Sequence, residues 1–353
     1  MGMRSCCLGL AMGVVMLPRV ATAQSPAWTV SPQVVVEQEP ITFPSKGAEL
    51  HGVLYFAVGS SRQPTMVVLH GASSPSKDLP LYRHLKQMLP RLGMAVFVFD
   101  RRGSGASGGN RRDALDFKML AEDGVAASRA LAKDPHVDGA RIGYWGISQG
   151  GWLALLAASE DARAAFAIAV SAPMTTPDVQ MNFAVANILR IDGYSDEDVA
   201  LAVKARSAND AYLRGTERRA DAAEALKAVR DKPWFPLIYQ DATPDDPKTS
   251  TWLRQMEFDP VPVLARVKAP VLMVYGEADP WVPVGESLRR LKARAAKDRN
   301  VQTVVINGAD HTMMLDVDPK EQIDPKFFAK EQPDAPAYFA ELTAWLERQV
   351  LTQ

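Results

Sequence analysis

Residues 141–154, R-I-G-Y-W-G-I-S-Q-G-G-W-L-A, constrain the fold of this chain more than any other stretch. The apolar run 142–147 predicts a short buried strand, and the Ala- and Leu-rich run 152–158 predicts a helix. The corner between them, residues 146–150, reads G-I-S-Q-G. A serine flanked by glycines at such a corner is typical of a nucleophile elbow, a strained turn that exposes the hydroxyl at the top of a sheet. Ser148 is therefore the candidate nucleophile.

The same pattern occurs a second time, as G-A-S-G-G at residues 105–109. Its serine, Ser107, lies several residues beyond an apolar run that ends near Asp100. Two glycines and an asparagine come directly after Ser107, so no helix is expected to begin there. Because G-x-S-x-G arises by chance in roughly one chain of this length in ten, the pattern alone carries little weight. Only Ser148 has a strand before it and a helix after it.

The composition is that of an ordinary globular protein. The chain has 353 residues, of which 47% are hydrophobic and 23% charged, enough for one large domain or a domain with an inserted lid. The formal net charge is −1 at pH 7, which gives no indication of binding to nucleic acid or to an anionic membrane surface.

The first 23 residues predict a secretory signal peptide. Arg4 precedes an uncharged and mostly apolar run at residues 6–17, and Ala21-Thr22-Ala23 is a small-x-small cleavage site. The apolar run is too short for a membrane span, so we expect an exported protein, periplasmic or secreted, without a stable membrane anchor. Cleavage near Ala23 would remove Cys6 and Cys7, the two cysteines of the chain. We therefore expect no disulfide, and neither a metal nor a cofactor.

Apolar runs that can be buried on both faces alternate with helical segments along most of the chain. Such alternation predicts an α/β fold with a mostly parallel sheet covered by helices on both sides. The first two predicted strands form a hairpin around residues 45–47. The predicted strands are 41–43, 49–57, 66–69, 95–99, 141–147, 164–170, 271–275 and 301–306, and the predicted helices are 80–89, 113–133 with Asp113 as its N-cap, 150–159 and 336–350.

The alternation stops between residues 173 and 261. Three segments there have helical spacing, and residues 233–248 are aromatic, acidic and interrupted by proline. We expect a helical lid inserted after the sixth strand of a core formed by residues 24–172 and 262–353. Ligands of open α/β sheets bind at the carboxyl ends of the strands, so an insertion at this point would cover the site. A separate downstream domain is disfavoured because strand–helix alternation resumes at Val271.

A serine nucleophile needs a base that accepts its proton. Among the five histidines, His311 lies just beyond the last predicted strand, at the carboxyl edge of the sheet. The other four are placed in a hairpin strand (His51), at a strand end in a different motif (His70), in a helix (His84) and in a surface turn (His136). His311 is the candidate base.

The base in turn needs an acid that orients it. Asp279 comes after the strand 271–275 and so lies at the same edge. Glu277 on the same loop and Asp310 beside the histidine remain rivals, although a sequence neighbour rarely reaches the imidazole in the required geometry. The order Ser148, Asp279, His311 is the one expected for a nucleophile elbow.

Two backbone N–H groups are expected to stabilise the oxyanion. One belongs to Gln149, which comes directly after the nucleophile at a helix N-terminus. The other belongs to Ala72, in the loop after the strand 66–69, where Gly71 permits a tight turn. His70 in this loop is assigned to scaffolding rather than to proton transfer.

Together these motifs resemble the α/β-hydrolase superfamily over about residues 49–350. The resemblance rests on H-G-A at 70–72, D-R-R-G-S-G-A-S at 100–107, the elbow, G-x-x-D at 276–279 and G-A-D-H at 308–311. It implies an eight-stranded, mostly parallel sheet, and it explains Ser107 as part of a loop after the fourth strand. The branches most similar are serine esterases and dienelactone-hydrolase-like or acyl-peptidase-like enzymes.

Two departures from motifs of the superfamily narrow the set of branches that the chain resembles. Ala72-Ser73 stand where lipase-type esterases carry H-G-G-G. The elbow carries Ser148 rather than Asp, which argues against haloalkane dehalogenases and epoxide hydrolases.

We therefore predict an exported serine hydrolase that cleaves a small-molecule carboxylic ester through an acyl-enzyme. One alternative is a serine peptidase of the prolyl-oligopeptidase or acyl-peptidase type with the same triad. The other is a non-catalytic binding protein on a hydrolase scaffold. No cluster of Arg or acidic residues marks a charged substrate. The aromatic and Met residues open to a role in core or pocket are Phe183, Tyr194, Trp234, Phe235, Tyr239, Trp252, Trp281, Met313 and Met314.

Overall fold

The computed structural model describes residues 28, 33–110, 116–294, 297 and 299–352. The predicted signal peptide, residues 1–23, and the predicted N-cap Asp113 lie outside these ranges. None of the helices within the described ranges is both long and apolar enough to span a membrane.

One eight-stranded sheet organises the molecule, with the strand order β1-β2-β4-β3-β5-β6-β7-β8. The strands β1 and β2 pair antiparallel, as do β2 and β4, and all other neighbours pair parallel. This confirms the predicted mostly parallel sheet. The strands are β1 Val36–Ser45, β2 Ala48–Ala57, β3 Gln63–Leu69, β4 Ala95–Phe99, β5 Val137–Ile147, β6 Ala167–Val170, β7 Val271–Gly276 and β8 Val301–Ile306.

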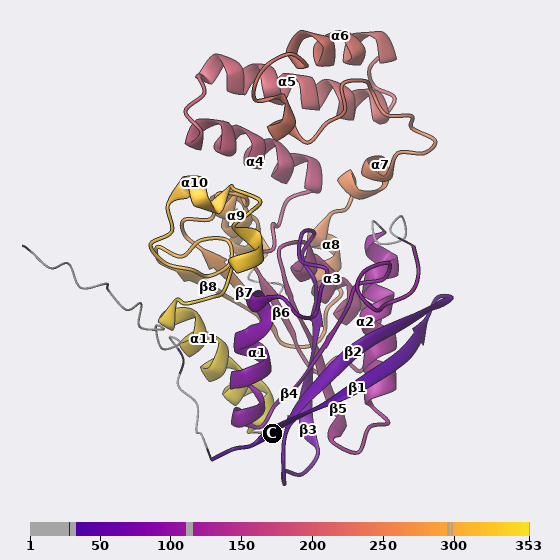
Figure 1. The fold of residues 1–353 in the computed structure, drawn as a ribbon, viewed down its shortest axis with the longest axis vertical. Helices are drawn as coiled ribbons and strands as arrows, with labels where there is room; N and C mark the ends of the chain where they lie inside the picture. The colour runs from indigo at the N-terminus through magenta and orange to yellow at the C-terminus, as the bar shows by residue number, and fades with distance from the viewer. Residues whose placement is uncertain (1–27, 29–32, 111–115, 295–296, 298, 353) are drawn as a thin grey trace, which may run out of the picture.

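Helices cover both faces of the sheet, which explains why the central strands are apolar throughout. Every residue of β3, β4, β6 and β7 is buried. One face packs against α2 (Phe117–Leu131), α3 (Gln149–Glu160) and α8 (Pro260–Leu264), and the other against α1 (Arg83–Met88) and α11 (Pro336–Leu346) (Figure 1). Alternate residues of each strand therefore enter two separate cores.

The helix boundaries depart from the prediction at several places. The helix predicted to begin at Asp113 begins at Phe117, where Asp116 accepts a hydrogen bond from the Met119 N–H at 3.1 Å as the N-cap. The segment predicted as one helix at 80–89 divides into a 3₁₀ turn, Pro80–Tyr82, and α1. The helix α9 (Val284–Arg294) was not predicted, because it is rich in charged residues and buries only Ser287 and Leu291.

Residues 173–261, here called the lid segment, contain no strand, and all of them are described. The helices of this segment form a layer beyond the core, at the top of Figure 1. They bury their own apolar cluster, which includes Val185, Leu226 and Trp234. Its helices are α4 Pro177–Ile191, α5 Asp196–Leu213, α6 Arg219–Val229, a 3₁₀ turn Phe235–Ile238 and α7 Thr251–Met256.

Candidate active site

The corner between β5 and α3 consists of Ser148 alone. Its backbone has φ 57° and ψ −126°, a conformation that is strained for a residue with a side chain. Two backbone hydrogen bonds hold it, one from the Ser148 N–H to the Val170 carbonyl at 2.8 Å and one from the Gly151 N–H to the Ser148 carbonyl at 2.9 Å. The strain is therefore maintained by the neighbouring strand and by the first turn of the helix.

The two flanking glycines are required by close backbone contacts. A Cβ on Gly146 would lie 1.9 Å from the Gly150 carbonyl oxygen, and one on Gly150 would lie 2.3 Å from the Leu69 carbonyl oxygen. Any side chain at either position would force the helix away from the sheet. The close approach of helix α3 to the sheet thus explains why glycine stands at both positions.

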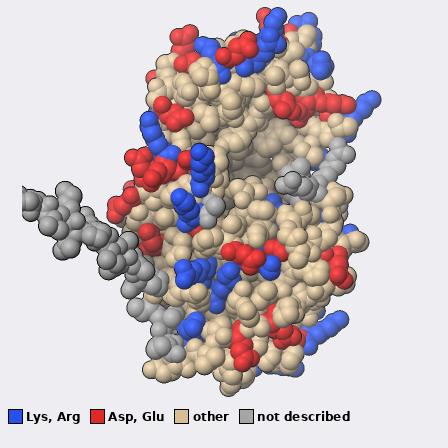
Figure 2. Space-filling model, in the orientation of Figure 1, with Lys and Arg blue, Asp and Glu red and all other residues tan. Residues whose placement is uncertain are grey.

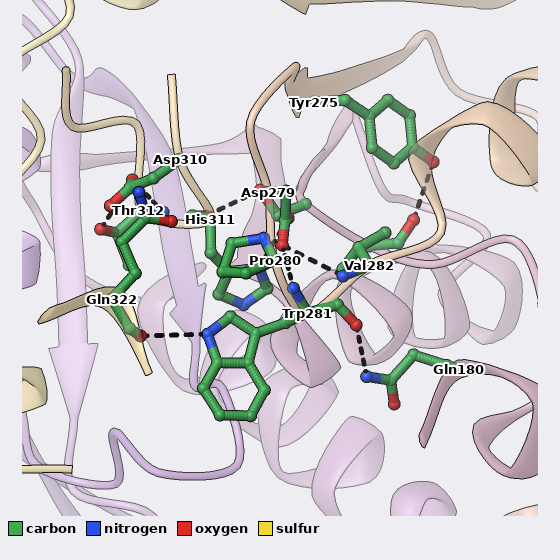
Figure 3. A network of polar contacts seen from close by, with 12 residues as sticks. Gln180, Tyr275, Asp279, Pro280, Trp281, Val282, Asp310, His311, Thr312 and Gln322 are labelled. Carbon is green, nitrogen blue, oxygen red and sulfur yellow. Dashed lines mark hydrogen bonds and ion pairs between the residues drawn. The ribbon is translucent and has the colours of Figure 1, made fainter. Parts of the chain in front are cut away.

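His311 and Asp279 form a hydrogen-bonded pair at the carboxyl edge of the sheet. The distance between His311 Nδ1 and Asp279 Oδ2 is 2.7 Å (Figure 3). The Asp279 side chain is fully buried, and its Oδ1 accepts from the backbone N–H groups of Trp281 at 2.8 Å and Val282 at 3.0 Å. Since an ionised carboxylate only accepts, the imidazole donates from Nδ1, which leaves Nε2 able to take a proton.

The environment of the imidazole favours its protonated form. Burial alone lowers the pKa of His311, but the charge of Asp279 and its hydrogen bond act more strongly in the other direction, and the net pKa is raised. A histidine with a raised pKa is a stronger base, which suits a group that must accept a proton from a serine hydroxyl.

The two rival acids have structural roles. Glu277 Oε2 accepts from the Gly308 N–H at 3.0 Å. Asp310 Oδ1 accepts from the N–H groups of Thr312 and Met314, each at 2.8 Å, and so shapes the turn that carries His311. Neither carboxylate is hydrogen-bonded to the imidazole, whereas Asp279 is.

Ser148 and His311 line one cavity of about 340 Å³ between the core and the lid segment. Figure 2 shows the surface hollowed between the two parts. The described side chains of Ser148 and His311 share this cavity without a hydrogen bond between them, and such contacts commonly tighten only when substrate is bound. The larger side chains that line it are Leu81, Phe117, Trp152, Gln180, Met181, Tyr239, Trp252, Gln255, Trp281, Phe328 and Glu331.

The predicted oxyanion donors Ala72 and Gln149 also line this cavity. The backbones of the two loops approach closely, because a Cβ on Gly71 would lie 3.3 Å from the Ile147 carbonyl oxygen. Gln149 is the first residue of α3, so helix geometry gives its N–H group no intrahelical acceptor. Both N–H groups thus remain predictions for an oxyanion hole, and the two residues that carry them line the same cavity.

His70 lies under this loop and is fully engaged. Its Nδ1 contacts the Tyr82 hydroxyl at 2.8 Å, and its Nε2 contacts the Phe99 carbonyl oxygen. Burial, aided by the charge of Arg101, lowers the pKa of His70 to about 4. A neutral imidazole with hydrogen-bond contacts at both ring nitrogens supports the structure of this loop.

Three of the aromatic residues left open by the sequence line the cavity: Tyr239, Trp252 and Trp281. Trp234 instead packs in the core of the lid segment, and Met313 packs in the core beneath the sheet. The sequence could not separate these groups, because the lid segment has an apolar cluster of its own.

Glu331 is a cavity residue that the sequence analysis missed. It is half-buried, and burial raises its pKa to about 7, although the charge of His311 acts to lower it. Of the described residues that line the cavity, only His311 carries an imidazole and only Glu331 a carboxylate. No motif marks Glu331, which lies in irregular chain twenty residues beyond His311.

Metal-ligating side chains do not gather at the cavity. Within the described ranges, one group of three has its donor atoms within 4.8 Å of one another, namely Glu39, Asp134 and His136. None of the three lines the cavity.

The sheet order, the elbow and the His–Asp pair at the carboxyl edge define the α/β-hydrolase class. Comparison with known proteins agrees with this class. The model of the family described as serine aminopeptidase, S33, matches residues 60–318, more than half of the chain. The chain belongs to this hydrolase family.

Curated relatives match over a shorter stretch. Thiohydrolase aneE of Aspergillus aculeatus is 32% identical over 124 residues, which cover 35% of this chain and 38% of the relative. Polyketide transferase ATR5 of Stachybotrys chlorohalonatus is 34% identical over 142 residues, which cover 40% and 46%. The chain thus spans less than half the length of these relatives.

Solved structures share the fold over nearly the whole chain. The α/β-hydrolase GrgF of Penicillium sp. sh18 is 20% identical with a TM-score of 0.56, covering 89% of this chain and 99% of that one. The esterase Pf2001 of Pyrococcus furiosus is 18% identical with a TM-score of 0.54, covering 89% and 91%. An acylaminoacyl peptidase of Pyrococcus horikoshii is 16% identical with a TM-score of 0.56, covering 89% and 42%. At these identities the likeness concerns the fold.

Proposed function

We propose that this chain is an exported serine hydrolase that cleaves small carboxylic esters through an acyl-enzyme. The observation that supports this most is the meeting of three features in one cavity: the strained Ser148 corner, the His311–Asp279 pair and the Ala72 and Gln149 N–H groups. Acyl transfer explains each of the three features, whereas a binding protein would not need the combination of all three.

In the proposed reaction, His311 Nε2 takes the hydroxyl proton as Ser148 Oγ attacks the ester carbonyl. The oxyanion accepts hydrogen bonds from the N–H groups of Ala72 and Gln149, of which each is worth about 10²–10³ in rate. His311 then gives the proton to the departing alcohol. Water repeats these steps on the acyl-enzyme and regenerates Ser148.

The cavity supports a small and mostly apolar substrate. Its volume of about 340 Å³ is near the lower end of the ~300–1,000 Å³ that ligand pockets occupy. Phe117, Trp152, Met181 and Trp252 line it, so apolar acyl or alcohol groups gain from burial there.

Turnover of p-nitrophenyl acetate and butyrate tests this proposal, with Ser148→Ala as the inactive variant. Ser107→Ala is the matched control, since both serines lie in G-x-S-x-G segments. Hydrolysis that persists in Ser148→Ala would overturn the assignment of the nucleophile. Failure of a fluorophosphonate to label the wild-type protein would revive the non-catalytic binding protein.

Peptide hydrolysis is the second candidate, and the description of the matching family as serine aminopeptidases favours it. The same triad would then attack an amide, and His311 would protonate the departing amine. Cleavage of aminoacyl-p-nitroanilides without turnover of any p-nitrophenyl ester would establish the peptidase instead.

Relatives described as a thiohydrolase and as polyketide transferases raise the question of whether water or another molecule accepts the acyl group. The same ester assay addresses this question. An added alcohol that diverts the acyl group from water would indicate a transferase.

Export is tested separately. The protein recovered outside the cytoplasm should have the mass of a chain that begins at Gln24.

A further inference from the structure

The loop after β4 carries two adjacent arginines, and they are bound in different ways. Arg102 donates to both carboxylate oxygens of Asp123, at 2.8 and 2.6 Å, and both side chains are 1% exposed. Arg101 is also buried, with 6% of its surface exposed. Within the part of the chain that the structure describes, however, no carboxylate forms an ion pair with Arg101. A buried cation that has no carboxylate in direct contact among the described residues is costly, so its contacts call for a functional explanation.

Among the described residues, the three acceptors of the Arg101 side chain all belong to the two loops of the expected oxyanion hole. Its Nη2 lies 2.6 Å from the His70 carbonyl oxygen, 3.0 Å from the Gly71 carbonyl oxygen and 2.9 Å from Gln149 Oε1. One nitrogen atom therefore connects the loop of Ala72 with the residue that supplies the second donor.

The Gly71 carbonyl and the Ala72 N–H belong to the same planar peptide unit. A charged donor on that carbonyl fixes the plane of the unit and therefore the direction of the Ala72 N–H. It also polarises the unit, which strengthens the N–H as a donor to an oxyanion on its other side. The tether to the Gln149 side chain holds the start of α3 at a fixed separation from this peptide.

The charge of Arg101 persists at neutral pH and is felt nearby. Burial lowers the pKa of its guanidinium to about 10, which leaves it protonated. Its positive charge is one cause of the lowered pKa of His70. Arg101 does not line the cavity, so it faces the back of the loops rather than the substrate.

We propose that Arg101 is the positioning residue of the oxyanion hole, holding the Ala72 and Gln149 N–H groups toward the developing oxyanion and adding a fixed positive charge behind them. This inference rests on the proposed acyl-enzyme chemistry at Ser148. It assigns a role to the first arginine of the segment D-R-R-G-S-G-A-S at residues 100–107, whereas the second, Arg102, is bound to Asp123.

The test compares Arg101→Met and Arg101→Lys with the wild type. Two readouts depend on the oxyanion: the second-order rate of fluorophosphonate labelling at Ser148 and the affinity for a trifluoromethyl ketone, each normalised to folded protein. We expect Arg101→Met to lose about 10²-fold in labelling rate, in ketone affinity and in kcat, with KM changed less than about threefold. Arg101→Lys keeps the charge and should stay within about tenfold of the wild type.

The neighbouring arginine supplies the matched control. Arg102→Lys weakens the ion pair with Asp123, so it should lower the melting temperature while the labelling rate per folded molecule stays near that of the wild type. A merely structural Arg101 would behave in the same way. An Arg101→Met variant that loses stability but labels at the wild-type rate would overturn the proposal.

Gln149→Met decides the case if Arg101→Met does not fold. The Gln149 side chain is half-buried at the helix start, so its replacement should leave the melting temperature nearly unchanged. Loss of one of the three tethers should slow labelling about fivefold. An unchanged labelling rate in Gln149→Met would overturn the proposal. A wild-type protein that is not labelled at all would overturn the proposed function, and this inference with it.

Discussion

The chain contains two G-x-S-x-G segments, and the structure uses them in opposite ways. In residues 146–150 the positive φ falls on Ser148 itself, and its side chain lines the cavity. In residues 105–109 the positive φ values fall on Gly105 and Gly109. Ser107 is buried there, and its Oγ accepts from the His51 N–H at 2.9 Å.

The two segments differ in the conformation of the chain directly after each serine. A helix begins at Gln149, so the chain must reverse within one residue, and Ser148 carries a strain of about 1–3 kcal/mol. After Ser107 the glycines absorb the turn, so that serine is free to serve as a structural hydrogen-bond acceptor. Strain placed on a residue with a reactive side chain therefore marks a functional corner better than the five-residue pattern does.

The largest expected effect comes from exchanging the two serines for alanine. Ser148→Ala should lower kcat for p-nitrophenyl butyrate by about 10⁵-fold or more, because the attacking atom is lost. Ser107→Ala should keep kcat and instead lose about 1 kcal/mol of unfolding free energy, since the partly buried His51 N–H loses its acceptor. Steady-state kinetics and urea unfolding of both variants separate the two roles. Equal losses of activity would contradict the comparison.

Two aspartates extend the contrast, since each comes after a parallel strand at the same edge of the sheet. Asp279→Asn should lower kcat by about 10⁴-fold, because an amide can hold His311 in the wrong tautomer. Asp100→Asn should leave kcat per folded molecule nearly unchanged but destabilise the Ser107 loop. Its carboxylate accepts from the N–H groups of Lys77 and Ala106, each at 3.0 Å.

The pH dependence of stability distinguishes Asp100 further. Burial alone raises the pKa of Asp100, but the hydrogen bonds from Ala106 and Lys77 and the charge of Lys77 outweigh it and lower the pKa. A lowered pKa stabilises the fold above the ordinary value of about 3.9 and ceases to do so as pH falls below it. The stability difference between wild type and Asp100→Asn, about 2 kcal/mol at pH 7, should therefore shrink below about pH 4. A constant difference from pH 7 to pH 3 would contradict this origin.

Much of the fold could be predicted because its strands are buried on both faces. The run 95–99 was placed to the residue, since a continuous apolar stretch in a parallel sheet has few alternatives. The strand 301–306 was also placed to the residue, although it contains Gln302 and Thr303 and is mostly half-buried. The helix α9 and the short lid helix α7 were missed because few of their residues are buried. The start of α2 was misplaced because two aspartates before it, Asp113 and Asp116, can act as a cap.

The candidate site was predictable where residues lie in the loops that follow strands. Ser148, Asp279 and His311 lie in the loops after β5, β7 and β8, and a parallel sheet brings such loops to one edge. Arg101 also lies in such a loop, after β4, but the sequence analysis explained that loop only as structure around Ser107. Glu331 had no comparable signal, because it reaches the cavity from irregular chain that only tertiary packing places.

Gly146 and Gly108, one glycine from each segment, should differ in the cost of an added Cβ. Gly146→Ala places a Cβ within 1.9 Å of the Gly150 carbonyl oxygen, and we expect a loss on the order of 3 kcal/mol of unfolding free energy. Gly108→Ala meets the backbone of Glu49 instead, its carbonyl oxygen at 3.2 Å and its nitrogen at 3.6 Å, on an exposed loop, and should cost about 1 kcal/mol or less. Urea denaturation of both variants measures this, and a larger loss in Gly108→Ala would contradict the account of the elbow.

The smallest expected effect concerns charge in the cavity around Ser148. Because burial raises the pKa of Glu331 to about 7, its negative charge develops between about pH 6 and pH 8. An ester that carries a carboxylate should then lose kcat/KM relative to a neutral ester as pH rises, by about fivefold over this range. Glu331→Gln should abolish this dependence while leaving kcat/KM for the neutral ester little changed on the plateau above its acid limb.

The same variant should also move the acid limb of the neutral-ester profile. Glu331 helps to raise the pKa of His311, after the larger effect of Asp279, while Asp310 also faces both groups. Removing the charge at Glu331 should shift that limb to lower pH by less than about one unit. Glu277→Gln is the matched control, since Glu277 binds the Gly308 N–H and does not line the cavity. Glu277→Gln could alter the preference between the two esters as much as Glu331→Gln does. That result would contradict the prediction, because the preference would then come from the net charge of the molecule. It would not come from the cavity, which Ser148 lines and Ser107 does not.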